Sequence, residues 1–322
     1  MDLELRHLRV LVEVADAGSI STAAARLRVS QPALTAQLRR IENSLGSAVF
    51  ERSRRGVMPT EYGCDVLNRS RIVLSEVSQI RGLDPRRVPQ KGDLISADVG
   101  GFPGSPLWAF GARLETLVPA ENIRLQTQWS MQMLLQMLES ARLDCAILRQ
   151  MPDFEIRLPD NVTGQVMVEV DPAFVALPSG HPLAAQEEID LADLARETWV
   201  GEPPDDSGMH AHFTRACRAA GFAARLEHLT IDSLAAAQMI ENGRAIALTS
   251  SSAAEPQGVA IRPLRGTPIH RRLLLTWRLD SPLAAHADKL LRLGIEAYLE
   301  IVRESPAYAV WSRRHPTPLA PP

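Results

Sequence analysis

The chain has 322 residues, of which 45% are hydrophobic and 23% are charged, and its formal net charge is −3. This length suits two or three domains with sizeable cores, and the charge argues against a nonspecific coat on nucleic acid. The sequence has no apolar run of about eighteen residues and no secretion signal at its first residues. We therefore expect a cytoplasmic protein without a membrane partner.

The three cysteines are far apart in the sequence and form no metal-type pair: Cys64, Cys145 and Cys217. Such spacing is typical of reduced structural thiols rather than of a disulfide framework or a zinc site. We expect no metal and no cofactor, while a redox-sensing role for a cysteine stays open.

The N-terminal residues predict two helices joined by a short turn. Apolar residues recur at helical spacing from Leu5 to Ala15, and Gly18 would end that helix. Ser19 would cap a second, short helix, whose central alanines allow another helix to pack closely. Followed by a third helix, this pattern has the size of the helix-turn-helix DNA-binding motif.

A third helix would be capped by Ser30, with Pro32 tolerated in its first turn. Its apolar residues recur at helical spacing and predict one buried stripe of Leu34, Leu38, Ile41 and Leu45. The opposite face is small in the middle and cationic at its far end, where Arg39 and Arg40 lie. Such a face can approach a DNA groove closely and present hydrogen bonds and positive charge.

The segment from Arg52 to Pro59 predicts a two-stranded hairpin with a basic tip that contains a glycine. Such a tip can lie along the DNA backbone or enter the minor groove.

A long helix is predicted from Glu61 to about Ile80, and its apolar residues Val66, Val73 and Ile80 are seven apart. This spacing is typical of paired helices, so we expect the helix to dimerise, although packing against its own domain is an alternative.

Residues 5 to 63 resemble the winged helix-turn-helix of the LysR-type transcriptional regulators. The matching residues are Gly18-Ser19, Ala23-Ala24, Leu27, Ser30-Gln31-Pro32-Ala33-Leu34, Leu38, Ile41-Glu42, Leu45-Gly46, Phe50-Glu51-Arg52, Thr60 and Gly63. Two positions depart from the family pattern, because Leu11 stands where Phe is common and Pro59 where Leu is usual.

The resemblance assigns DNA contacts residue by residue. It implies that Gln31 and Pro32 contact base edges and that Thr35 contacts a phosphate or a base. It places Arg39 in the groove and Arg54 on the backbone or in the minor groove. Arg40 and Arg55 are equally compatible with weak surface pairing to glutamates. The candidate DNA-binding residues are Ser30, Gln31, Pro32, Thr35, Arg39, Arg40, Arg54 and Arg55.

From Lys91 onward, short apolar runs alternate with amphipathic helices, which predicts a two-lobed α/β domain. Expected strands include residues 165–170, 173–177, 199–201, 226–229, 245–249 and 271–277. Four motifs resemble the LysR-type effector-binding domain, which is similar in fold to type II periplasmic binding proteins: Arg142-Leu143-Asp144-Cys145-Ala146-Ile147, His181-Pro182-Leu183-Ala184, Ala220-Gly221-Phe222 and Gly243-Arg244-Ala245-Ile246-Ala247-Leu248. The expected fold class is therefore α/β with an N-terminal winged helix-turn-helix.

Ligands of open α/β sheets bind at the carboxyl ends of strands and at the N-termini of the helices that follow. That rule selects the candidate effector-binding residues Gly101, Phe102, Ser130, Arg149, Glu202 and Thr249, for which ordinary loop positions are the alternative.

Four segments are expected along the chain. Residues 1–60 form the winged helix-turn-helix, residues 61–91 the linker helix and hinge, and residues 92–304 the effector-binding domain. Residues 305–322 are expected to form a proline-rich, disordered tail.

The resemblance implies a ligand-responsive regulator that binds double-stranded DNA at an interrupted inverted repeat. It implies a homodimer through the linker helix, a homotetramer, an unidentified small-molecule effector in the cleft, and RNA polymerase as a candidate partner. An architectural DNA-binding protein is one alternative, and a solute-binding protein or an enzyme is another. The acid–histidine cluster does not favour an enzyme, because residues two apart do not share a helix face: Asp205, Asp206, His210 and His212.

Overall fold

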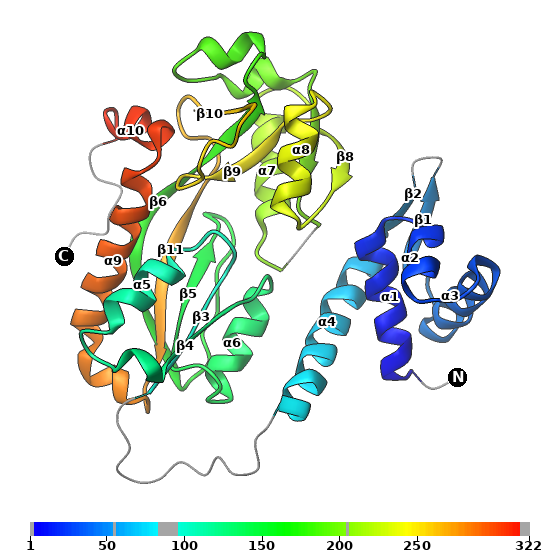
Figure 1. Cartoon of the computed structure of the whole chain (residues 1–322), viewed down its shortest axis with the longest axis horizontal. Coiled ribbons are helices and arrows are strands. Elements are labelled where there is room, and N and C mark those ends of the chain that lie inside the picture. The colour runs from blue at the N-terminus through cyan, green and yellow to red at the C-terminus, as the bar shows by residue number, and fades with distance from the viewer. Residues whose placement is uncertain (1–2, 54–55, 83–95, 204–205, 316–322) are drawn as a thin grey trace. The chain divides into compact units, whose positions relative to one another are not determined.

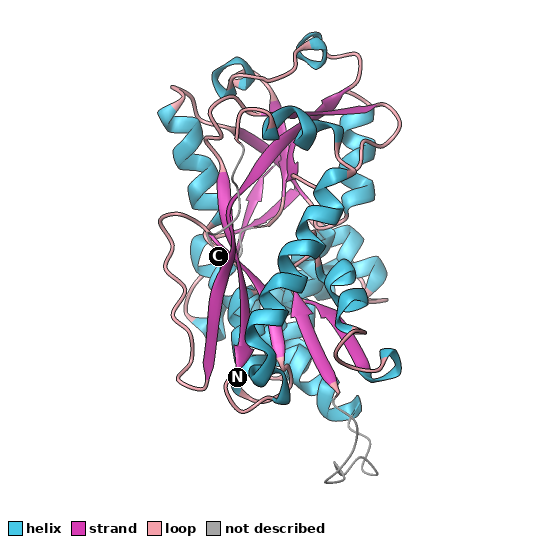
Figure 2. Cartoon of the chain, turned by 90° about the vertical axis from the view of Figure 1, so that its left-hand side faces the viewer, coloured by secondary structure: helices cyan, strands magenta, loops and turns pink. Residues whose placement is uncertain are grey.

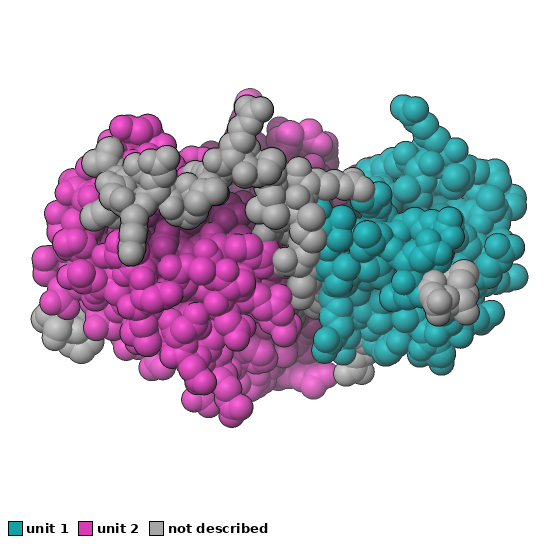
Figure 3. All heavy atoms as spheres, turned by 90° about the horizontal axis from the view of Figure 1, so that it is seen from below, with its two compact units in different colours: residues 1–91 teal, residues 92–322 magenta. Residues whose placement is uncertain are grey.

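The computed structural model describes residues 3–53, 56–82, 96–203 and 206–315. The chain divides into two compact units, residues 1–91 and residues 92–322, which Figure 3 colours separately.

The first unit is helical apart from one antiparallel hairpin (Figure 1). It contains α1 (Leu5–Ala17), α2 (Ile20–Arg26), α3 (Gln31–Leu45), β1 (Phe50–Ser53), β2 (Gly56–Pro59) and α4 (Glu61–Gly82). The predicted caps are confirmed. Gly18 ends α1 in the left-handed conformation, with φ of 60°. The Ser19 and Ser30 hydroxyl groups accept hydrogen bonds from the first turns of α2 and α3.

The core of the first unit is built on the predicted stripe of α3. Leu34, Leu38 and Ile41 are buried and pack with apolar residues of α1 and α2, while Leu45 is half-buried at the edge of this core. Because the stripe is buried, the opposite side of α3 is left on the surface of the unit.

The long helix α4 packs along α1, and Leu67 is its buried contact with the core. Arg71 on α4 also pairs with Asp16 on α1, with 2.6 Å between Nη2 and Oδ1. Gly63 is required near the start of the helix, because a Cβ there would overlap the Val49 carbonyl oxygen. Val73, a residue of the predicted dimer seam, is 41% exposed on this single chain. The hinge is predicted at residues 81–89. Its first two residues, Arg81 and Gly82, still belong to α4, and the others lie outside the described residues.

The second unit contains a seven-stranded mixed sheet and a separate pair of parallel strands. The sheet order is β10-β6-β11-β5-β3-β4, with β9 also paired to β6, and the separate pair is β7-β8. The strands are β3 (Ala97–Gly101), β4 (Ile123–Thr127), β5 (Cys145–Gln150), β6 (Val162–Pro178), β7 (Thr198–Gly201), β8 (Arg225–Leu229), β9 (Ala247–Ser250), β10 (Val259–Pro263) and β11 (His270–Arg278).

Helices flank these strands and complete two lobes (Figures 1 and 2). The longer helices are α5 (Leu107–Leu114), α6 (Met131–Glu139), α7 (Met209–Ala219), α8 (Ser233–Glu241), α9 (Ala287–Arg303) and α10 (Pro306–Ser312). The 3-10 turns are η1 (Ala120–Asn122), η2 (Pro182–Ala185), η3 (Leu191–Leu194) and η4 (Pro282–His286). The lobe with α5, α6 and α9 is called lobe I, and the lobe with α7 and α8 is called lobe II.

One continuous strand, β6, corrects the prediction of two strands at residues 165–170 and 173–177. Asp171 and Pro172 lie within the strand, although proline cannot donate a hydrogen bond to a sheet ladder. The strand passes through this point because its partners change there, from β11 on one side to β9 and β10 on the other. As a result, β6 connects the two lobes.

The predicted disorder from Ser305 onward is wrong for residues 305–315. Ser305 caps α10, Pro306 occupies its first turn, and Tyr308 and Trp311 are buried. Trp311 donates a hydrogen bond from its indole nitrogen to Thr267 Oγ1 at 2.8 Å. These aromatic side chains make α10 part of the second unit, while residues 316–322 lie outside the described residues.

Candidate DNA-binding surface and ligand cavity

The exposed side of α3 brings most of the predicted DNA-binding residues together. Gln31, Pro32, Arg39 and Arg40 are exposed along this side, and Thr35 is half-buried beside them. The face combines an amide, a small central region and two guanidinium groups on a rigid helix. Its chemistry suits hydrogen bonding to base edges and charge pairing with phosphates.

Ser30 has a structural role at the start of this surface. Its hydroxyl oxygen accepts a hydrogen bond from the Ala33 amide at 3.3 Å, which satisfies one of the free N–H groups at the helix start. The remaining predicted residues, Arg54 and Arg55, lie outside the described residues.

The β1–β2 hairpin is held against the helices by polar contacts. The Glu42 carboxylate on α3 accepts hydrogen bonds from the amides of Val49 and Phe50 at 2.9 and 3.2 Å. The Val57 amide on β2 donates to the Gly18 carbonyl oxygen at 3.0 Å. Charge-assisted hydrogen bonds to backbone amides are among the stronger ones in proteins. They position the hairpin relative to α3, a role for Glu42 that the sequence analysis did not assign.

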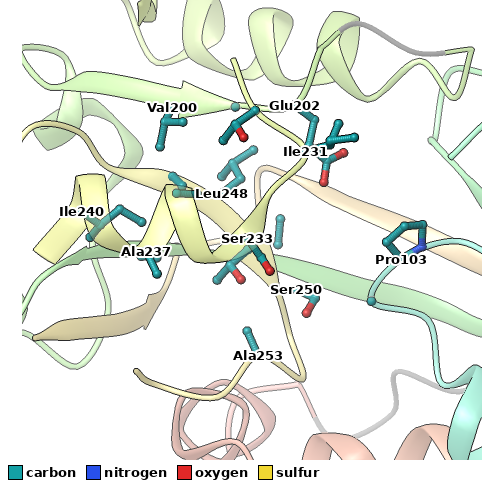
Figure 4. A pocket seen from close by; sticks show the side chains of 18 of the residues that line it. Pro103, Val200, Glu202, Ile231, Ser233, Ala237, Ile240, Leu248, Ser250 and Ala253 are labelled. Carbon is teal, nitrogen blue, oxygen red and sulfur yellow. The ribbon is translucent and has the colours of Figure 1, made fainter. Parts of the chain in front are cut away.

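A cavity of about 710 Å³ lies between the lobes of the second unit (Figure 4). Lobe I contributes Pro103, Gly104, Trp129 and Arg149, and lobe II contributes most of the remaining wall. Among the predicted effector-binding residues, Arg149, Glu202 and Thr249 line this cavity. The volume falls in the range of small-molecule sites.

The other three predicted effector-binding residues, Gly101, Phe102 and Ser130, do not line this cavity. Phe102 is fully buried, with the guanidinium carbons of Arg149 and Arg271 at 5.2 and 4.8 Å from its ring centre. It therefore supports two arginines that reach the cavity, an arrangement favoured by the electron-rich faces of its ring.

Arg271, which sequence reasoning missed, is fixed by a buried carboxylate. Its Nε donates to Asp171 Oδ2 at 2.7 Å, and the Ser251 hydroxyl donates to Oδ1 at 2.5 Å. The Tyr298 hydroxyl also donates to Oδ1, at 3.1 Å. Burial and the charge of Asp171 together raise the pKa of Tyr298, which keeps its hydroxyl protonated as a donor. No local sequence signal connects these residues.

Ser130 caps α6 and also contacts lobe II. Its hydroxyl donates to Asp206 Oδ2 at 2.5 Å, and the Met131 and Gln132 amides donate to the same carboxylate at 2.8 and 2.9 Å. Asp206 therefore occupies the start of α6 and links the two lobes. Sequence reasoning considered Asp206 only in the acid–histidine cluster.

Two of the three cysteine thiols are buried in the second unit. Burial raises the pKa of the Cys145 thiol, and it raises the pKa of the Cys217 thiol to about 11. Both are therefore protonated and poorly reactive at neutral pH. The described residues contain no group of three or more histidine, cysteine or acidic side chains placed to hold a metal ion. Among the described residues, no helix combines the length and the hydropathy that a membrane span requires.

Two family models match the chain. The model described as "Bacterial regulatory helix-turn-helix protein, lysR family" matches residues 5–64, and the "LysR substrate binding domain" matches residues 107–298. The chain is 35% identical to the small neutral protease regulatory protein of Streptomyces coelicolor, over 97% of this chain and 92% of that protein. It is 29% identical to the transcriptional regulator BudR of Raoultella terrigena, over 86% of this chain and 95% of that protein.

Solved structures share the fold. A cysteine mutant of OxyR from Corynebacterium glutamicum matches with a TM-score of 0.55 and 21% identity, over 98% of this chain and 96% of that chain. Full-length CbnR in complex with its target DNA matches with a TM-score of 0.51 and 23% identity, over 91% of this chain and 100% of that chain.

Proposed function

The chain belongs to the LysR family of bacterial transcriptional regulators, and from this premise we propose that it binds an interrupted inverted repeat in double-stranded DNA through α3 and the β1–β2 hairpin. The observation that carries the proposal is the division of α3 into a buried apolar stripe and an exposed polar, cationic face. The site is proposed to comprise Ser30 as the cap, Gln31, Pro32, Thr35, Arg39 and Arg40 on α3, and Arg54 and Arg55 on the hairpin.

Recognition of an inverted repeat requires two copies of α3. We propose that α4 pairs with its counterpart in a second chain, which is supported by the exposed apolar side chain of Val73 on a helix otherwise packed against α1. Two half-sites about one helical turn apart would then meet two recognition helices. We further propose that two dimers form a homotetramer through their second units and that the protein contacts RNA polymerase at the promoter. Its proposed location is the cytoplasm, where bacterial DNA lies.

The second unit is proposed to bind a small-molecule effector in its cavity, with Arg149, Glu202 and Thr249 among the contacts. Residues of both lobes line this cavity, so a ligand there would stabilise one lobe arrangement over another. Coupling between such a ligand and a distant site is typically about 1–3 kcal/mol. The proposed role is regulation, and it includes no catalytic step.

Footprinting of the full-length protein on DNA that flanks its own gene tests this proposal. We expect protection of two half-sites whose centres are separated by about one or two helical turns, about 10 to 21 base pairs. Arg39→Ala should weaken protection, whereas Arg9→Ala, which removes an exposed arginine of α1, serves as the matched control. Protection without sequence preference would instead indicate architectural binding.

A further inference from the structure

We propose that the cavity of the second unit takes an uncharged, predominantly apolar ligand, because carboxylates of the chain itself occupy the positions that would attract an anion. This inference rests on the proposed function of the cavity as the effector site. Four separate contacts support it, at two helix starts and at two buried arginines.

The start of α6 is the first of these positions. A helix N-terminus attracts anions through its free N–H groups and its dipole. At α6, the Asp206 carboxylate from lobe II accepts from the Met131 and Gln132 amides and from the Ser130 hydroxyl. Trp129, the residue before this cap, lines the cavity. The chain therefore supplies its own anion directly beside the cavity wall.

The start of α8 is also occupied by a carboxylate, which here belongs to the N-cap residue of the helix itself. Asp232 Oδ1 accepts hydrogen bonds from the Leu234 and Ala235 amides at 2.9 and 3.2 Å, and Asp232 and Ser233 line the cavity. A ligand anion would have to displace this internal acceptor.

The two arginines that reach the cavity are also balanced by acids. Arg271 is bonded to buried Asp171, and Arg149 Nη1 lies 3.9 Å from Oε2 of Glu202, whose side chain is 46% exposed. Separating Arg271 from its buried acid would leave an uncompensated charge, which is strongly unfavourable. Each arginine of the cavity wall therefore has a carboxylate of the chain beside it, and the Arg271 pair is the costlier one to break.

The rest of the wall is largely hydrocarbon. Figure 4 shows Val200, Leu248, Ile240 and Ala237 around the space, with Ile231 at its edge. Trp199, Phe213 and Leu226 belong to the same wall. Burial of an apolar ligand gains free energy in proportion to the apolar area removed from water. The few hydroxyl groups, such as those of Thr249 and Ser250, can orient a neutral polar group.

An internal carboxylate competes at a high effective concentration, because it is tethered beside its site. An external anion must overcome this competition, whereas an uncharged ligand leaves the internal pairs intact. Removal of Asp206 should therefore change the charge preference of the cavity more than its affinity for neutral molecules.

Two matched fluorescent probes test the inference on the full-length protein. N-phenyl-1-naphthylamine is neutral, and 1-anilinonaphthalene-8-sulfonate has the same aromatic framework with one negative charge. Fluorescence titration should show that the wild type binds the neutral probe at least tenfold more tightly. Ala237→Phe fills the cavity and should weaken the neutral probe at least tenfold. Ser250→Phe is the second cavity-filling variant, and thermal melts of both establish that they fold.

Asp206→Ala should tighten binding of the anionic probe at least fivefold and change the neutral probe less than threefold. The control is Asp160→Ala, which removes an exposed aspartate and should change neither probe. A wild type that binds the anionic probe as tightly as the neutral one, with Ala237→Phe abolishing both, would overturn the inference but leave the cavity as a ligand site. An unchanged anionic affinity in Asp206→Ala would also overturn it. If the folded cavity-filling variants bind both probes as tightly as the wild type does, the proposed effector site itself is overturned.

Discussion

The two units use positive charge in opposite ways. In the first unit, Arg39 and Arg40 are exposed on one side of a helix, where a polyanion can reach them. In the second unit, Arg149 and Arg271 are buried, stacked on Phe102 and paired with acids. An exposed arginine costs little to keep unpaired, whereas a buried one requires a partner. The same residue type therefore lies on the proposed DNA-binding surface in one unit and beside a buried phenylalanine at the cavity wall in the other.

The largest effect should follow when a buried pair loses its acid. Asp171→Ala leaves Arg271 without its carboxylate and removes the acceptor of Ser251 and Tyr298. We expect the free energy of unfolding to fall by about 3–5 kcal/mol, as for other broken buried ion pairs. Urea denaturation, followed by a signal from the second unit, measures this loss.

Asp190→Ala is the control for that experiment, because Asp190 forms an exposed pair with Arg265 and both side chains are 54% exposed. Its loss should cost less than about 1 kcal/mol. Equal losses for the two variants would contradict the distinction between buried and exposed charge.

A smaller loss is expected when the hairpin loses its contact with α3. Glu42→Ala removes the acceptor of the Val49 and Phe50 amides, and the half-buried setting limits the cost to about 2–3 kcal/mol. The melting temperature of the first unit should fall, and DNA affinity should fall with it because the hairpin is no longer fixed. Glu51→Ala, on the exposed side of β1, should leave both quantities unchanged.

A substitution on the exposed surface of α3 should change DNA recognition without lowering the free energy of unfolding. Gln31→Ala removes an exposed amide, so the free energy of unfolding should not change. Discrimination between the operator and a mismatched site should drop by roughly 1–3 kcal/mol, the scale of one side chain reading one base. Competition binding at fixed salt measures this drop, and undiminished discrimination would remove Gln31 from the base-reading residues.

The helices of the first unit could be predicted from local sequence, because they begin and end at capping residues that form hydrogen bonds with residues close by in the chain. Gly18, Ser19 and Ser30 are caps whose partners lie within a few residues. A similar signal is present at α10, where Ser305 caps a helix with Pro306 in its first turn, although the proline-rich composition of this end predicts disorder. Composition there was a poorer guide than the position of one serine and one proline.

The cavity could be predicted only in outline. The strand-end rule selects Arg149, Glu202 and Thr249, and these three residues line the cavity. The partners of charged groups could not be predicted, because Ser130 and Asp206 are 76 residues apart and Asp171 and Arg271 are 100 apart. Such pairs depend on how β6 and β11 carry the chain between the lobes. A charge in the sequence therefore does not show whether it is available to a ligand.

The smallest predicted effect is a gain in stability when glycine replaces a residue with a positive φ angle, and it can be measured in both units. Arg28 in the turn before α3 and Ala141 after α6 have φ angles of 56° and 59°, in the region that favours glycine. Substituting glycine removes the steric cost of the side chain but adds freedom to the unfolded chain, so each change should stabilise its unit by about 0.5–1 kcal/mol. Thermal melts of Arg28→Gly and Ala141→Gly measure the two gains. A gain for Ala141→Gly alone would show that the Arg28 side chain stabilises the turn before α3 through contacts of its own. Arg28 would then have a structural role, unlike the exposed arginines of α3.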